Sequence, residues 1–146
     1  MLETGAATQA PGILAGKVAV VTGGTRGLGL AIATAFATNG ASVVVASRTH
    51  AAAVGAAQLI DAHTGRSNAA FGVQADVGRR DAVDGLASAA VERHGRFDIW
   101  VNNAGVLNDG LIGMTSQASI DKTLAVNLAG VLHGIQQAAQ IGRAHV

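Results

Sequence analysis

The chain has 146 residues and a net charge of +1; 49% of its residues are apolar and 13% are charged. This composition supports one domain with a buried core and excludes extensive disorder. The low net charge and the lack of a basic run exclude the electrostatic footprint of a nucleic-acid-binding protein.

The chain contains no cysteine, which excludes disulfides, thiolate catalysis and cysteine-based zinc sites. Its five histidines lack the spacing of metal ligands, so we expect no metal site. No stretch reaches the ~18 consecutive apolar residues that a membrane span requires. Residues 1–16 contain no basic residue and no apolar signal core, so we expect a flexible lead-in rather than a secretory signal. These features predict a cytoplasmic protein that binds neither membranes nor nucleic acid.

Four short, mostly apolar runs are typical of strands buried on both faces of a parallel sheet. They comprise residues 18–21, 43–45, 69–73 and 99–101. Between and after them, apolar stripes with helical period predict four helices. The first stripe contains Leu28, Ile32, Ala35 and Phe36 and is closed by Asn39 and Gly40. The others contain Val54, Ala57 and Ile60; Val83, Leu86, Ala90 and Val91; and Ile120, Leu124, Leu128, Val131 and Ile135.

The alternation of strands and helices predicts an α/β fold of the Rossmann type, a doubly wound parallel sheet with helices on both faces. The expected order of its four strands is 3-2-1-4. Ligands of such folds bind where the order reverses, outside the carboxyl ends of strands 1 and 4. We expect this domain to span residues 17–140 and to be incomplete.

A glycine-rich loop follows the first strand and leads into a helix. In this setting glycines permit a tight turn, and a pyrophosphate can sit on the free N–H groups of the helix N-terminus. A purely structural turn is the alternative, whereas a P-loop is excluded because no Gly-Lys-Ser/Thr follows. The residues predicted to contact a dinucleotide are Gly23, Gly24, Thr25, Arg26, Gly27, Leu28 and Gly29.

The pattern Thr-Gly-x-x-x-Gly-x-Gly at residues 22–29 resembles the cofactor motif of the short-chain dehydrogenase/reductase family. Three further matches follow in the family's order: Asp76-Val77, the run Asn-Asn-Ala-Gly at residues 102–105, and Asn127. The resemblance covers residues 14–139. It implies an NAD(P)-dependent oxidoreductase that transfers hydride between a carbonyl and an alcohol of a small molecule, and we expect the full-length parent to be a homo-oligomer.

The resemblance also assigns roles to these residues. Asp76 and Val77 are expected to line the adenine pocket, and Asn127 matches the asparagine of the catalytic tetrad. The residues expected to lie along the cofactor are Asn103, Ala104 and Gly105. Each polar residue also has a structural interpretation. Asp76 could cap a loop, Asn102 and Asn103 could be buried amides that satisfy backbone groups, and Asn127 could be a solvated position.

The second strand ends in Ser47 and Arg48, where an NAD-binding protein is expected to have a carboxylate for the ribose. A guanidinium can bind a 2′-phosphate bidentately, and Arg26 could reach the same phosphate from the glycine loop. We therefore predict NADP as the cofactor rather than NAD. The alternative is that Arg48 is a solvated charge that stacks only on adenine.

The chain contains no tyrosine, although the family's chemistry requires one, followed four residues later by a lysine. Its only lysines, Lys17 and Lys122, do not stand in that setting. Two hypotheses follow: a truncated and inactive fragment of an enzyme, or a non-catalytic NAD(P)-binding protein such as a sensor or pseudoenzyme. A methyltransferase is disfavoured by the motif at residues 102–105.

The last six residues, 141–146, read as the translation of a common short-read sequencing adapter. We therefore expect them to be a non-native tail; an ordinary polar tail is the alternative. Truncation would leave the fourth strand as an exposed edge and the last helix without apolar partners, which predicts poor solubility.

Overall fold

The structure, a computed structural model, describes residues 12–143. Four parallel strands form one sheet in the order β3-β2-β1-β4, which confirms the predicted Rossmann-type topology. The strands are β1 (Val18–Thr22), β2 (Ser42–Ser47), β3 (Ala70–Gln74) and β4 (Ile99–Val101). The helices are α1 (Gly27–Thr38), α2 (His50–Thr64), α3 (Arg80–His94), the short 3₁₀ helix η1 (Ile112–Met114), α4 (Gln117–Leu124), the π-helical η2 (Ala125–Ala129) and α5 (Gly130–Arg143).

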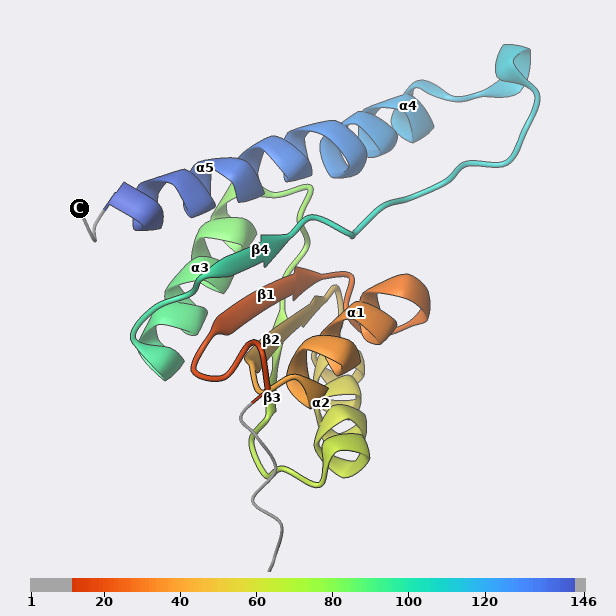
Figure 1. Cartoon of the computed structure of the whole chain (residues 1–146). Coiled ribbons are helices and arrows are strands. Elements are labelled where there is room, and N and C mark those ends of the chain that lie inside the picture. The colour runs from red at the N-terminus through yellow and green to blue at the C-terminus, as the bar shows by residue number, and fades with distance from the viewer. Residues whose placement is uncertain (1–11, 144–146) are drawn as a thin grey trace, which may run out of the picture.

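Two layers of helices cover the sheet, with α1 and α2 on one face and α3 and α5 on the other (Figure 1). Alternate residues of the central strands point to opposite faces, as the pleat of a strand requires. Val21 and Val45 pack in the core of the α1–α2 side, whereas Val20 and Val44 pack in the core of the α3–α5 side. The nearly continuous apolar runs of the sequence therefore serve two cores at once.

Helix α1 packs through a different face from the one that its apolar stripe indicates. Its buried residues are Gly29, Ala33 and Ala37, whereas Leu28 is 71% exposed. Ile32 and Phe36 are only partly buried at the edge of the core. Small residues at i, i+4 spacing let the helix backbone approach the sheet more closely than large side chains would permit, so the small residues face inward.

The fourth predicted helix forms as α4, η2 and α5, but most of its predicted stripe faces outward. Leu124, Leu128 and Ile135 are each more than half exposed. The inward face instead contains Gly130 and Gly134, where a side chain would collide with the Val77 carbonyl and the Asn102 amide. The absence of side chains at these two positions lets the helix lie directly on β4 and on the loop that follows β3.

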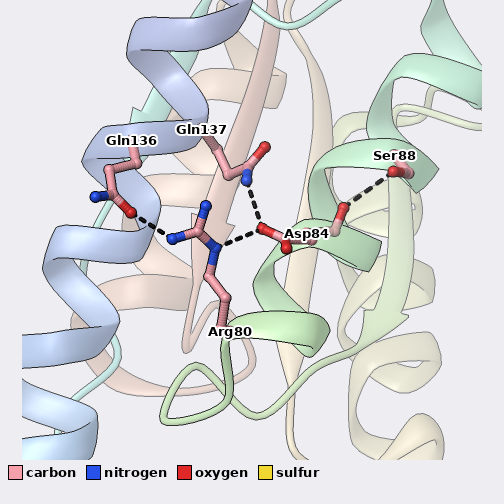
Figure 2. Close-up of polar contacts among 5 residues, drawn as sticks. All are labelled: Arg80, Asp84, Ser88, Gln136 and Gln137. Carbon is pink, nitrogen blue, oxygen red and sulfur yellow. Dashed lines mark hydrogen bonds and ion pairs between the residues drawn. The ribbon is translucent and has the colours of Figure 1, made fainter.

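A polar network joins α3 to α5 across the sheet's second face (Figure 2). The Gln137 amide, almost fully buried, donates to the carboxylate of Asp84 at 2.5 Å. Arg80 donates to the same carboxylate oxygen at 2.9 Å and to the Gln136 side-chain carbonyl at 2.5 Å. Because Asp84 is shared, the network fixes the start of α3 relative to α5.

The predicted domain, residues 17–140, can be compared with the structure at both ends. Residues 1–11 of the expected lead-in lie outside the described residues, but Leu14 is ordered and its N–H donates to the Asn39 carbonyl at 2.9 Å. At the other end α5 continues to Arg143, and Ile141 packs partly buried against the core. The expected non-native tail therefore does not interrupt the helix up to residue 143. Residues 144–146 lie outside the described residues, and the origin of the tail stays a prediction.

None of the helices between residues 12 and 143 has the length and apolar character that a membrane span needs.

Candidate nucleotide-binding site

A cavity of about 1030 Å³ opens at the carboxyl ends of the strands, where the strand order reverses. Thirteen of the fourteen predicted cofactor residues line it: Gly23, Thr25, Arg26, Gly27, Leu28, Gly29, Ser47, Arg48, Asp76, Val77, Asn103, Ala104 and Gly105. The remaining one, Gly24, lies beneath the loop. Its N–H donates to the Ala46 carbonyl at 3.2 Å, and an added side chain would press on Val45.

The glycine loop has the backbone geometry that close approach to a ligand requires. Gly23 and Gly27 adopt positive φ angles of 64° and 52°. Helix α1 then begins with no side-chain cap at Arg26 and no acidic residue in its first turn. Its first N–H groups therefore remain available at the cavity, and the positive end of the helix dipole favours an anion there.

Asn103 and Thr22 lock the loops after β1 and β4 together. The Thr22 hydroxyl donates to the Val101 carbonyl and accepts the N–H groups of Asn103 and Ala104, each at 3.1 Å. The Asn103 amide donates to the carbonyls of Thr22 and Gly23. Asn103 thus satisfies backbone groups, as its structural interpretation expects, and it also lines the cavity.

Asn102, one residue earlier, points elsewhere. Its side-chain carbonyl accepts the indole N–H of Trp100 at 3.0 Å beneath Gly134 of α5. This amide therefore supports the packing of α5 on β4.

Asp76 both caps a turn and faces the cavity. Its carboxylate accepts the N–H of Gly78 at 3.0 Å, and it lines the cavity together with Val77. Arg79 lies just beyond and forms a two-fold contact with Asp81. That hydrogen bond, together with the charge of the carboxylate, raises the pKa of Arg79, and its guanidinium lowers the pKa of Asp81.

The predicted catalytic residue, Asn127, lies in the π-helical segment η2 and does not line the cavity. Its amide donates to the carbonyl of Val106 and accepts the N–H of the same residue, each at 2.8 Å. Val106 itself lines the cavity. Asn127 is therefore linked to the cavity through the backbone of Val106 in the loop after β4.

The profile of the family described as short chain dehydrogenase matches residues 17–143. The chain belongs to this family. It is 42% identical over 127 residues to an uncharacterised oxidoreductase of Methylorubrum extorquens. The matched segment covers 87% of this chain and 50% of that protein.

Solved short-chain dehydrogenases share the fold. A short-chain dehydrogenase of Burkholderia cenocepacia in complex with NADP has a TM-score of 0.80 and 39% identity, covering 88% of this chain and 51% of that one. A dehydrogenase/reductase of Mycobacterium marinum has a TM-score of 0.81 and 32% identity, covering 88% and 49%. The chain thus spans about half the length of these relatives.

The cavity also has lining residues that the motifs do not contain. Two of them are basic: Arg79, after β3, and Lys122, on α4. Neither belongs to a glycine or asparagine motif, and only the folding of the loop after β3 and of α4 toward the same cavity brings them to the site. The others are Ala46, Thr49, Ala52, Ala75, Gly78, Val106, Leu107, Asn108, Ala125 and Val126.

Proposed function

We propose that this chain is the NADP(H)-binding half of an oxidoreductase that transfers hydride between a carbonyl and an alcohol of a small molecule. The observation that carries the proposal is the pair Arg26 and Arg48 on the cavity wall, with Ser47 where an NAD-binding carboxylate would stand. The Burkholderia relative, crystallised with NADP, supports the same cofactor.

The charge of the cavity favours a polyanion. Four of the chain's ten Lys and Arg residues line it, namely Arg26, Arg48, Arg79 and Lys122, against the single lining carboxylate Asp76. The lining thus carries a formal charge of +3 in a chain whose total is +1. Such a concentration of charge at a concave site raises the local concentration of anionic ligands.

Two features add to the preference for a 2′-phosphate. Among the described residues, the guanidinium groups of Arg26 and Arg48 form no ion pair or hydrogen bond, so their donors are available to a ligand. Helix α2 begins at the cavity without a side-chain cap at Thr49 and without an acidic residue in its first turn. Both helix N-termini at the cavity therefore favour anions.

The cofactor supplies the hydride chemistry, and the protein supplies binding, orientation and the proton. This chain's residues would provide the first two: the glycine loop and α1 would hold the pyrophosphate, Asp76 and Val77 would flank the adenine, and Asn103 to Gly105 would lie along the cofactor. The chain has no tyrosine to exchange the proton. We therefore propose that it binds NADP(H) without turnover, and that the activity belongs to a longer cytoplasmic, homo-oligomeric parent.

A second candidate is a non-catalytic NADP(H)-binding protein, such as a sensor, and the lack of tyrosine favours it. Independent sequencing of the locus beyond codon 140 separates the two. A continuing frame that encodes Tyr-x-x-x-Lys supports the enzyme, whereas a true stop codon after Val146 supports the sensor.

The cofactor proposal is tested by titrating the 146-residue chain with NADPH and NADH and following the fluorescence of Trp100, its only tryptophan. We expect NADPH to bind at least about 10-fold more tightly, since charged hydrogen bonds to the extra phosphate contribute about 1.5–3 kcal/mol. Equal or tighter binding of NADH contradicts the proposal.

A further inference from the structure

Three consecutive carbonyls at the end of β2 are each held by a different hydrogen-bond donor. The Ala46 carbonyl accepts the N–H of Gly24 at 3.2 Å, and the Ser47 carbonyl accepts the N–H of Ala75 at 2.8 Å. The Arg48 carbonyl lies beyond the sheet and accepts the side-chain amide of Gln74 at 3.0 Å. A side chain thus extends the hydrogen-bonded ladder of β2 and β3 by one residue.

Gln74 is well placed for this contact because it ends β3 directly opposite Ser47 in the register of the sheet. Its backbone is fixed by the ladder, and its exposed side chain reaches along the sheet edge to the next residue of the neighbouring strand. Gln74 does not line the cavity. The hydrogen bond of its side chain instead links it to Arg48, which does line the cavity.

Arg48 stands at a junction with little other restraint. Ser47 before it belongs to β2, and Thr49 after it is the N-cap of α2, with an extended backbone. The Thr49 carbonyl accepts the N–H of Ala53 at 3.2 Å. Arg48 is thus the single residue between the sheet and the cap. The bond from Gln74 restrains the peptide group that follows Arg48, and through it the backbone position from which the Arg48 side chain extends.

We propose that Gln74 is a positioning residue for nucleotide specificity, which holds Arg48 so that its guanidinium meets the 2′-phosphate of NADP(H). This inference rests on the proposed NADP(H) function. It predicts that the loss of Gln74 weakens the binding of NADPH selectively, because NADH offers Arg48 no phosphate at that position. A residue that only stabilised the sheet would affect both nucleotides alike.

The test is a double-mutant cycle on the 146-residue chain. Gln74→Met removes the donor and keeps the length of the side chain, while Gln74→Thr keeps a strand-forming residue that is too short to reach Arg48. We expect either variant to raise the Kd for NADPH about 3- to 10-fold and the Kd for NADH less than about 2-fold, the range of one exposed hydrogen bond. In the Arg48→Ala background, Gln74→Met should change the Kd for NADPH less than about 2-fold.

Gln117→Met serves as the matched control, because Gln117 is an exposed residue of α4 that does not line the cavity. Thermal unfolding of each variant verifies that the fold is retained. The inference is overturned if Gln74→Met weakens both nucleotides equally, or if its effect persists in the Arg48→Ala background. A wild-type chain without preference for NADPH overturns the proposed function and this inference together. A preference for NADPH that is the same size in both Gln74 variants as in the wild type overturns the inference alone.

Discussion

The amide of Asn127 forms two hydrogen bonds with the backbone of Val106, one as donor and one as acceptor, each 2.8 Å long. This pair ties the π-helical turn of the last helix to a loop that lines the cavity. A single π-helical turn inside an α-helix is rare and is frequently found at functional sites. Here the π-helical turn places the Asn127 side chain where it can bond with both backbone groups of Val106, in the loop after β4.

The first prediction concerns this tie. Asn127→Ala leaves the N–H and carbonyl of Val106 without these partners, so we expect the free energy of unfolding to fall by about 1–3 kcal/mol. NADPH affinity should fall as well, because the loop loses its restraint. Urea unfolding followed by Trp100 fluorescence measures the first effect, and nucleotide titration the second. Leu128→Ala is the control, since Leu128 is 56% exposed. An equal loss of stability and of NADPH affinity in both variants contradicts a role for the Asn127–Val106 hydrogen bonds.

A second prediction concerns the end of β2. Arg48→Ala should raise the Kd for NADPH about 10- to 100-fold, the value of a charged hydrogen bond to phosphate, with little change for NADH. Ser47→Asp should go further and favour NADH, because a carboxylate repels the 2′-phosphate and can bind a ribose hydroxyl. Arg93→Ala is the control, since Arg93 stacks over Phe71 and does not line the cavity. Unchanged NADPH binding in both cavity variants refutes the assignment.

A third prediction compares an alanine substitution in the glycine loop with one in helix α2. A side chain at Gly29 would stand 2.3 Å from the Gly23 carbonyl oxygen and 2.4 Å from the Asn103 amide nitrogen. Gly29→Ala must therefore displace the glycine loop, and we expect a lower melting temperature and a loss of nucleotide binding. Gly55→Ala in α2 meets nothing within 4 Å and should stabilise the helix by up to about 1 kcal/mol. Thermal melts and nucleotide titrations compare the two variants. A Gly29 variant that is as stable and binds nucleotide as well as the Gly55 variant shows that the glycine loop does not require a glycine at position 29.

Local patterns were enough to predict the strand order and the glycine loop, whereas Asp76, Val77 and residues 103–105 were predicted from the resemblance to the family. The apolar runs, the glycine loop and the run Asn-Asn-Ala-Gly each encode their structure within about ten residues, and the alternation of strands and helices then fixes the edge at which they meet. Gly24 is the instructive exception. It lies at a variable position of the motif and serves the packing of the loop on β2.

Hydrophobic periodicity predicted the wrong buried face for helices that pack closely on the sheet through small residues. Helix α1 buries Gly29, Ala33 and Ala37, and the last helix buries Gly130 and Gly134, while larger residues of both helices stay exposed. Small residues at i, i+4 spacing were visible in the sequence and carry this signal. The positions of Arg79, Lys122 and Gln74 at or beside the cavity were not visible, because they depend on which helices, strands and loops lie side by side.

A fourth prediction concerns pH. Partial burial works against the charge of Asp98, but the N–H of Val18 and the positive charges of Arg96 and Lys17 outweigh it and lower the pKa of this carboxyl. A pKa that is lower in the folded chain stabilises the fold above the ordinary pKa of aspartate, and this stability is lost as the pH falls through the folded-state value.

The free energy of unfolding of the wild-type chain should therefore exceed that of Asp98→Asn by the largest margin near pH 7, and the margin should shrink below about pH 4. Urea titrations at a series of pH values measure this difference. Asp109→Asn, in an exposed loop, provides the control. A margin that stays constant with pH shows that the carboxylate charge of Asp98 does not matter.

The last prediction concerns the outer face of α4, η2 and α5. Ile120, Leu124, Leu128, Leu132 and Ile135 are 39–56% exposed and follow one another at helical spacing, so they form a continuous apolar stripe. Together with the edge of β4, this stripe favours self-association of the 146-residue chain. We expect the chain to elute from size-exclusion columns as oligomers or aggregates at micromolar concentration. Replacing Leu124 and Leu128 by Gln should shift it toward the monomer, while Leu59→Gln on the exposed side of α2 should not. A wild-type chain that elutes as a monomer and unfolds cooperatively shows that the stripe is tolerated in water.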